Sequence, residues 1–341
     1  MKKILKWIGF LIGFGVLLIG GIFLLNYFGT SLNPKSGKGT SLKDPGTTIS
    51  VLNWNLGYAG LGKDSDFVAD GGEHFYPPSK DAVLGNLEGI RSVIATNRAD
   101  IHIFQEISEP DMLTLGVDVL AGVRDSLPDD NWYFTNDIST RFIPQKSAMH
   151  HGMAFFSRLK TDPVQTIRLP LEPTRLNGTL KRQYHTQVRE FKDANGEAWA
   201  IFNIHLSAFD ANGNIRVQQF ERLLEIVDTF YQDGKHVVVG GDWNMQLIPT
   251  DFPHTTKQEY LFWLKTLPHE SLKPGWKMLV DETVPTARTN ERPFVKGENY
   301  TTIIDGFLIS PNVDSISLKT IDTNFEFTDH QPVWGEFRAK P

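Results

Sequence analysis

The stretch HVVVGGDWN, residues 236–244, contains the pattern that decides the fold. Its apolar run over 236–240 is typical of a short buried strand, and Gly241 ends that run. An acid and an amide, Asp242 and Asn244, follow directly. A strand that ends in such groups presents them at one edge of a sheet. We therefore look for further strands that end in the same way.

Similar polar groups follow other apolar runs along the chain. The pieces are Asn53-Trp54-Asn55, Phe104-Gln105-Glu106, Asn203-Ile204-His205-Leu206, Ile303-Ile304-Asp305-Gly306 and Phe327-Thr328-Asp329-His330. Carboxylate and amide oxygens are the ligands that Mg²⁺ and Mn²⁺ prefer, and histidines bind phosphate or transfer protons. Each piece alone also fits a solvated loop acid, an Asx turn or a half-buried histidine. Only their joint occurrence indicates a site.

The periodicity predicts an α/β domain. Strands are expected over 48–55, 99–106, 131–135, 152–157, 184–191, 197–205, 236–240, 302–309, 313–321 and 332–338, and helices over 80–97, 111–127 and 214–231. The helices fall between pairs of strands. This order favours two packed sheets with helices outside. No glycine-rich nucleotide loop is present, which disfavours nucleotide-cofactor folds.

The N-terminus has the pattern of a membrane anchor. Residues 1–6 form a basic tail, 7–28 a transmembrane segment, 29–48 a flexible linker rich in Gly, Ser, Thr and Pro, and 49–341 the catalytic domain. The uncharged run 7–25 would rise about 28 Å as a helix, close to the roughly 30 Å hydrocarbon core. The lysines place the N-terminus in the cytoplasm and the domain outside. A cleaved signal peptide is the alternative, although the run is long for one and no Ala-x-Ala site follows.

Composition excludes several classes of protein. The chain of 341 residues has no cysteine, which excludes disulfide scaffolds, thiol nucleophiles and thiolate metal sites. The net charge is −6, of which residues 1–48 contribute +5, so the remainder carries −11. An acidic domain argues against a basic module that coats nucleic acid, but a bound cation can still serve a nuclease.

The order of the strand-end motifs resembles the endonuclease/exonuclease/phosphatase superfamily, which includes deoxyribonuclease-like and neutral sphingomyelinase-like enzymes. The resemblance extends from about residue 49 to 338, and the anchor suggests a membrane-tethered branch. It implies a four-layer sandwich of two packed mixed β-sheets flanked by helices, here preceded by one transmembrane helix. It also implies Mg²⁺-dependent attack of water on a phosphate ester. The matching positions are Asn55, Glu106, Asn203, His205, Leu206, Arg216, Gln219, Gly241, Asp242, Asn244, Asp305, Asp329 and His330, with Gly152–Ser157 as a matching strand.

The same resemblance implies the roles of these residues. Glu106 and Asn55 would hold Mg²⁺, or Mn²⁺, with Asp329 as a further ligand. Asp242 would orient or deprotonate the attacking water, with Asn244 positioning it. His205 and His330 would donate to phosphate oxygens, and Asp305 would orient His330. Two assignments are more open: Arg182 is either a phosphate clamp or a solvated loop residue, and Glu190 is a guess for the support of His205.

The resulting hypothesis is a membrane-anchored, outward-facing phosphoesterase that hydrolyses a phosphodiester. Tethering beside a bilayer slightly favours a phospholipid or sphingolipid headgroup as substrate. A nuclease acting on DNA or RNA is the nearest alternative, because the loops offer Arg141, Lys146, Arg288, Arg292 and Lys296. A non-catalytic binding module on the same fold is an alternative of another class. No obligate protein partner is evident.

Overall fold

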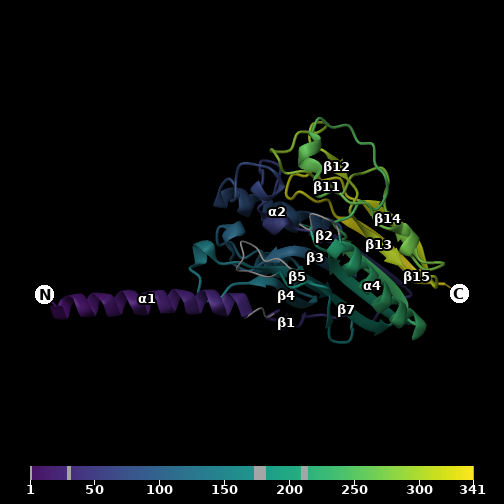
Figure 1. The fold of residues 1–341 in the computed structure, drawn as a ribbon. Coiled ribbons are helices and arrows are strands. Elements are labelled where there is room, and N and C mark those ends of the chain that lie inside the picture. The colour runs from purple at the N-terminus through teal and green to yellow at the C-terminus, as the bar shows by residue number, and fades with distance from the viewer. Residues whose placement is uncertain (1, 29–31, 173–181, 209–213, 341) are drawn as a thin grey trace.

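Two mixed β-sheets pack face to face, with helices on their outer faces (Figure 1). The computed structural model describes residues 2–28, 32–172, 182–208 and 214–340. The first sheet has the order β1 (Lys35–Gly37), β4 (Asn131–Ser139), β5 (His150–Ser157), β3 (Ile101–Ser108), β2 (Thr48–Asn55), β15 (Val333–Ala339) and β14 (Val313–Thr320).

The second sheet has the order β10 (Lys277–Leu279), β13 (Asp305–Ile309), β9 (His236–Asp242), β8 (Ala198–His205), β7 (His185–Lys192) and β6 (Gln165–Arg168). A short ladder joins β11 (Ala287–Arg288) to β12 (Thr301–Thr302). Each large sheet has one parallel pair, β2 with β3 and β8 with β9. A helix connects each pair, as parallel strands require: α2 (Lys80–Thr96) and α4 (Asn214–Gln232).

Side-chain alternation along the strands builds the layers. In β2, Ile49 and Val51 face the second sheet, whereas Leu52 and Trp54 face α2 and α3 (Val119–Ser126). In β8, Ile201 faces the first sheet, and its neighbours on either side pack toward α4. The predicted four-layer α/β sandwich is therefore confirmed.

The predicted helix over 80–97 is confirmed, but the one over 111–127 is wrong in its first half. Ser79 caps α2 by accepting from Ala82 N at 3.1 Å. In contrast, residues 112–114 form only a 3₁₀ turn, which Asp111 caps. Leu115 and Gly116 then adopt left-handed backbone, with φ of 49° and 81°, and the regular helix starts afresh at α3. Side-chain caps thus override the helical periodicity here.

Several strands differ from the prediction, and β1 and β11 are among those that were not predicted. β4 continues four residues beyond the expected end at 135. The strands β6 and β10 were not predicted at all. Both lie at edges of the second sheet and are only four and three residues long, so neither carries a readable alternation.

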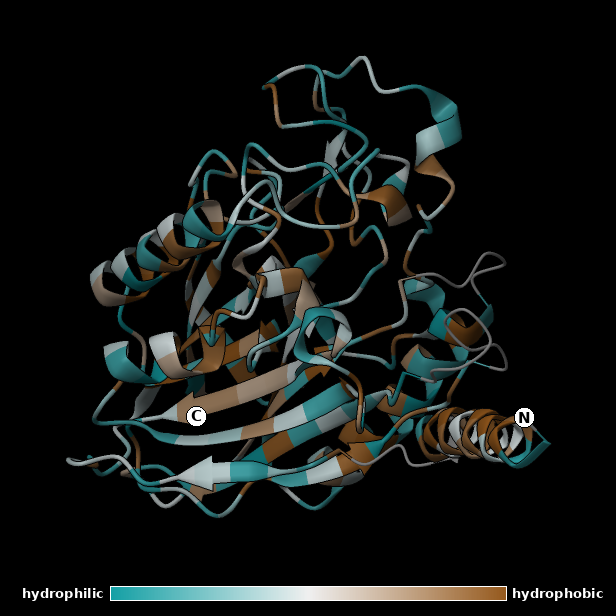
Figure 2. Cartoon of the chain, turned by 90° about the vertical axis from the view of Figure 1, so that its left-hand side faces the viewer, coloured by the Kyte–Doolittle hydropathy of each residue, from teal (hydrophilic) through white to brown (hydrophobic). Residues whose placement is uncertain are grey.

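The N-terminal helix α1 (Lys2–Phe28) projects away from the domain (Figures 1 and 2). Among the described residues, Lys2–Asn26 is the one helix long and apolar enough to cross a membrane, a test that a signal sequence also passes. Part of the segment expected to be a flexible linker is instead held by the domain. Strand β1 pairs with β4, and Lys43 forms a bridge with Leu159.

A network of buried amides links the two sheets beneath the strand ends. Gln105 Nε2 donates to Asn53 Oδ1 at 2.9 Å and to Asn203 Oδ1 at 2.6 Å. Asn203 Nδ2 in turn donates to Ala154 O and to Gln187 Oε1. Because all these side chains are fully buried, breaking one bond would leave an unsatisfied polar group in the core. The network therefore fixes the register of one sheet against the other.

Candidate active site

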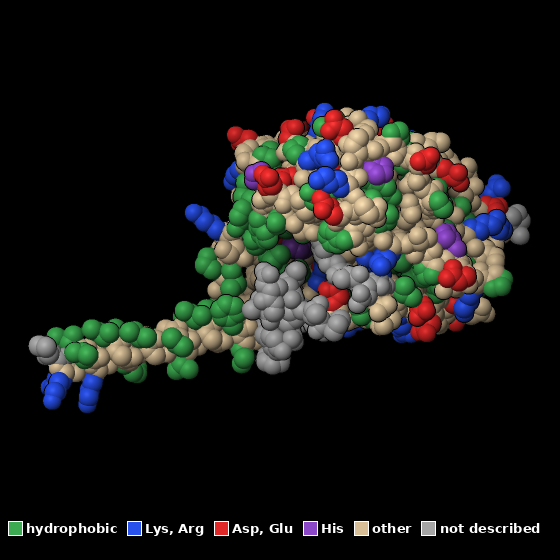
Figure 3. Space-filling view, turned by 45° about the horizontal axis from the view of Figure 1, so that its top comes forward, with side chains coloured by type: hydrophobic (Ala, Val, Ile, Leu, Met, Phe, Trp, Pro, Cys, Tyr) green, Lys and Arg blue, Asp and Glu red, His purple; other side chains and the backbone are tan. Residues whose placement is uncertain are grey.

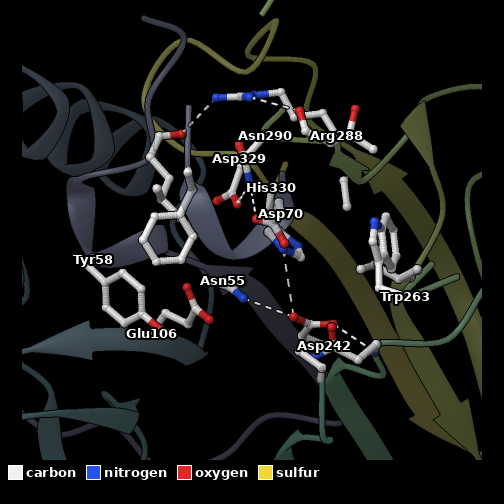
Figure 4. A pocket seen from close by; sticks show the side chains of 17 residues that line it. Asn55, Tyr58, Asp70, Glu106, Asp242, Trp263, Arg288, Asn290, Asp329 and His330 are labelled. Atoms are coloured by element: carbon white, nitrogen blue, oxygen red, sulfur yellow. Dashed lines mark hydrogen bonds and ion pairs between the residues drawn. The ribbon is translucent and has the colours of Figure 1, made fainter. Parts of the chain in front are cut away.

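The strand ends of both sheets converge on one pocket, as Figure 4 shows. Its wall includes six residues predicted from the sequence: Asn55, Glu106, Asp242, Asn244, Asp329 and His330. His205, Asp305 and Arg182 lie directly behind these six, within 4 Å of one or more of them. All nine predicted residues are thus brought together, although they come from segments up to 275 residues apart.

Asp242 lies at the centre of this arrangement. Asn55 Nδ2 donates to Asp242 Oδ2 at 2.9 Å, and the backbone N–H of Asn244 donates to Oδ1 at 2.8 Å. The Nε2 atoms of His205 and His330 lie 3.7 and 3.8 Å from the same Oδ2. Two imidazoles and one carboxylate therefore point at a single small volume, which is the arrangement needed to hold a phosphate beside an attacking water.

His330 is held by Asp305, whose Oδ2 lies 2.9 Å from Nδ1 of the ring. Burial lowers the pKa of His330, but the Asp305 and Asp242 carboxylates outweigh burial and raise the pKa well above its ordinary value. Ligand atoms of Asp242, Asp305 and His330 lie within 4.8 Å of one another, a spacing that a metal ion could also use. Since Nδ1–H donates to the Asp305 carboxylate, Nε2 can donate toward the pocket only when the ring is doubly protonated, and the raised pKa favours that form.

Glu106 is aimed into the pocket by an irregularity in β3. The pairing of β3 with β5 shifts register between Phe104 and Ile107, and Glu106 has φ of 50°. A bulge of this kind redirects a side chain at the end of a strand. Burial and the nearby Asp329 carboxylate raise the pKa of Glu106. The positive charges of His205 and Arg182 act in the opposite direction, but the pKa stays above its ordinary value.

Asp137 is the partner of His205 that sequence reasoning missed. Its Oδ2 lies 3.7 Å from His205 Nδ1. The guess of Glu190 is wrong, because its carboxylate pairs with Lys235 at 2.7 Å. Asp137 sits in a second register shift, between Asn136 and Ile138 of β4. Its only signal in the sequence was an acid just beyond the expected end of a strand.

Arg182 does not line the pocket. Its Nη2 atom lies 3.9 Å from Glu106 Oε1 and 3.6 Å from Asp137 Oδ2. The guanidinium therefore stands between two carboxylates and offsets their charge. The solvated-loop alternative for Arg182 is wrong, since its side chain is only 9% exposed.

Three further residues of the site, Asp70, Arg288 and Asn290, lie outside the strand-end motifs. Asn290 Nδ2 donates to Asp329 Oδ2 at 2.7 Å and to Asp70 Oδ2 at 3.1 Å. Burial, with the Asp329 and Glu106 charges, raises the pKa of Asp70 to about 7. Arg288 donates to the carbonyls of Leu61, Gly62 and Ser65, which holds the loop before Asp70 against the site. Long loops without periodicity gave no signal for these contacts.

The donor set fits a divalent cation that prefers oxygen ligands. Four carboxylates line the pocket, Asp70, Glu106, Asp242 and Asp329, and the lining guanidinium, Arg288, is engaged with backbone carbonyls. Such a concentration of buried negative charge requires a counter-charge. Asn55 Oδ1 accepts one hydrogen bond, from Gly57 N, and so retains a lone pair for a metal.

Residues 52–330 match the model of the endonuclease/exonuclease/phosphatase family. The chain belongs to this family. It is therefore a metal-dependent hydrolase of phosphate esters, as the sequence predicted. No curated protein matches the chain.

Solved structures of several family members share the fold. TDP2 from D. rerio, complexed with a single-strand DNA product, has a TM-score of 0.56 at 12% identity and covers 86% of this chain and 100% of that one. An endonuclease/exonuclease/phosphatase from Beutenbergia cavernae DSM 12333 has a TM-score of 0.56 at 15% identity, and the match covers 86% of this chain and 72% of that one. The human Nocturnin catalytic domain, with bound sulfate, has a TM-score of 0.53 at 17% identity, and the match covers 87% of this chain and 97% of that one. At these identities the likeness concerns the fold alone.

Proposed function

We propose that the protein is a membrane-anchored phosphodiesterase that faces outward and hydrolyses the headgroup of a phospholipid or sphingolipid. The observation that carries this proposal is the attachment of a phosphoesterase site to α1, which is long and apolar enough to span a bilayer. Lys2, Lys3 and Lys6 at its start favour a cytoplasmic N-terminus. The domain would then face the outer leaflet, where headgroups are the most abundant phosphodiesters.

In this proposal Glu106, Asp329 and Asn55 Oδ1 hold Mg²⁺, with Mn²⁺ as an alternative. The bound ion would neutralise negative charge on the phosphate as it is attacked. Asp242 accepts the proton of the attacking water, and its hydrogen bonds from Asn55 and Asn244 keep it oriented.

The two histidines serve the phosphate. His205 and His330 donate from Nε2 to its non-bridging oxygens, and Asp137 and Asp305 support the opposite ring nitrogens. Arg182 adds positive charge 3.9 Å from Glu106, although it does not face the pocket directly.

Electrostatics support a lipid over a nucleic acid as substrate. Residues 49–341 carry a net charge of −11, which opposes a long polyanion. Of the loop cations that favoured a nuclease, Arg288 is buried against carbonyls, and Arg292 lies 3.4 Å from both Glu291 and Glu298. These two guanidiniums, among the residues that the structure describes, are therefore already engaged and are not free to bind a strand.

The full-length protein in mixed micelles can test this function. Hydrolysis of phosphatidylcholine, sphingomyelin, single-stranded DNA, RNA and bis(p-nitrophenyl) phosphate would be measured with Mg²⁺, with Mn²⁺ and with chelator. We expect metal-dependent lipid turnover that is lost in Asp242→Ala and kept in Asp125→Ala, a control at an exposed acid. Faster turnover of DNA or RNA would replace the lipid proposal. A folded protein inactive on every substrate would indicate a binding module.

A further inference from the structure

We propose that the loops 68–76 and 141–146 form a membrane-docking face that seats the domain on the bilayer spanned by α1. The proposal rests on the membrane anchoring proposed above. It concerns a different question, namely which face of the catalytic domain contacts lipid.

The first observation is a contact that attaches the domain to the end of the helix. Asn26 Nδ2 donates to Arg141 O at 2.9 Å, and Arg141 N donates to Asn26 Oδ1 at 2.7 Å. Asn26 is buried, although the helix residues preceding it are mostly exposed. A reciprocal pair of hydrogen bonds fixes orientation as well as distance. Loop 141–146 therefore lies where the helix leaves the hydrocarbon.

The chain after the helix continues this attachment. Asn136 N donates to Leu32 O at 2.7 Å, and Asn33 Nδ2 donates to Ser139 Oγ at 2.7 Å. Strand β1 then runs antiparallel along β4. These bonds join the segment just beyond the helix to the strand that leads into loop 141–146. The domain is thus not held on a long free tether but stands close to the membrane surface.

The second observation is a set of exposed apolar side chains on this side of the domain. Phe142 is 75% exposed, and Val68, Phe75 and Tyr76 are 46%, 42% and 46% exposed. Single exposed apolar residues are common, but a group of them beside an anchor is typical of a surface that enters a lipid interface. Figure 3 shows hydrophobic side chains gathered on the domain near the end of the helix.

A hollow of about 420 Å³ makes the two loops one continuous surface. Its wall is mostly apolar and includes Tyr76 from the first loop, Gln145 and Lys146 from the second, and Met112 and Leu115 between them. The lipid bilayer that holds α1 is the occupant that the helix attachment indicates for this face. A protein partner is the other possible occupant, and the experiment below separates the two.

The docking face is also connected to the active site. The ring of Phe75 lies 5.3 Å from that of Tyr76 and 6.1 Å from that of Phe67. Phe67 and Asp70 belong to the same segment and line the pocket. Insertion of Phe75 into the interface would therefore bring one wall of the pocket to the lipid headgroups.

Because the chain has no cysteine, single labels can test the face in the full-length protein. Phe75→Cys, Phe142→Cys, Leu17→Cys and Ile316→Cys would carry a fluorophore in phosphatidylcholine proteoliposomes, with quenching by nitroxide-labelled lipid as the readout. Ile316 is the matched control, an apolar residue 46% exposed on β14, away from α1 (Figure 1). We expect strong quenching at 17, 75 and 142 and at least threefold weaker quenching at 316.

The outcomes separate the two proposals. Quenching at 17 without quenching at 75 and 142 would overturn the docking face and leave the anchor standing. It would also point to a protein as the occupant. Absence of quenching at 17 would overturn both the docking face and the membrane anchor. As an activity readout, the double variant Phe75→Ser and Phe142→Ser should lose at least tenfold in turnover of vesicle lipid while keeping its turnover of bis(p-nitrophenyl) phosphate. Equal loss on both substrates would contradict docking.

Discussion

The Nδ1 atom of His330 lies 2.9 Å from Oδ2 of Asp305, and both side chains are buried at the ends of adjoining strands of different sheets. This pairing, together with Asp242, raises the pKa of His330 against the penalty of burial and so favours the protonated imidazole. In that form His330 presents an Nε2–H to the pocket. The sandwich brings the donor and its supporting carboxylate together only when both sheets are in register.

Asp305→Asn should move the alkaline limb of the activity profile to lower pH. A donor with a raised pKa acts below that pKa and is lost as pH rises through it. Removing the carboxylate returns the pKa of His330 toward the ordinary value of about 6.5, so activity is lost at a lower pH. We also expect turnover to fall by about 10²- to 10⁴-fold. The measurement is kcat/KM for bis(p-nitrophenyl) phosphate against pH. An unshifted limb would show that the pair does not govern the profile.

Glu106→Gln should raise the Mg²⁺ concentration needed for half-maximal rate by at least tenfold. The substitution keeps the shape of the side chain but removes a charged oxygen ligand. Isothermal titration of Mg²⁺ into the protein checks the same point without turnover. Glu336→Gln, at a half-buried position in β15, serves as the control. A metal titration identical to wild type would remove Glu106 from the metal site.

Asp137→Asn should lower kcat by about 10- to 100-fold and leave the Mg²⁺ requirement unchanged, since Asp137 acts through His205. Glu190→Gln, at the residue suggested by the sequence, should have little effect on kcat because its carboxylate faces Lys235. The comparison is made under saturating metal. If the two variants lost activity equally, the assignment of Asp137 would be mistaken.

Gly152→Ala should destabilise the fold by about 3 kcal/mol or more, which is the range for a clash with fixed backbone. An added Cβ would lie 2.0 Å from Thr135 O and 2.6 Å from Asp137 N. Gly85→Ala in α2 is the control, because nothing lies within 4 Å of its Cβ, and alanine there should be neutral or slightly stabilising. Chemical denaturation of both variants measures the difference. Equal stability would argue against the close approach at Gly152.

The strand-end residues could be predicted because each follows a recognisable apolar run. Asp242 and Glu106 lie near the ends of β9 and β3, and His330 shortly precedes β15. The apolar runs of these strands are readable, and the parallel or antiparallel pairing carries their ends to one edge. The layers of the fold could be predicted for the same reason, because the apolar runs mark the strands and helices that build them. Residues 173–181, just before Arg182, and 209–213, shortly after the Asn203–Leu206 piece, lie outside the described residues.

Asp137 and Asp70 could not be predicted, for different physical reasons. Asp137 depends on a register shift in β4, and a bulge has no sequence signal apart from the glycine opposite to it. Asp70 is held at the pocket by a hydrogen bond from Asn290, 220 residues away, which no local pattern encodes. The linker was misjudged since a three-residue edge strand such as β1 has no periodicity of its own.

The buried amides that tie Gln105 to Asn53 and Asn203 have an evolutionary consequence. They secure the strand ends that bear the reacting groups, independently of the long segments that carry Asp70, Trp263 and Asn290 to the rim of the pocket. Those segments can accept insertions and substitutions without displacing Asp242 or the histidines. A lineage built on this scaffold can exchange one phosphate ester for another by changing its loops, while its chemistry is inherited intact.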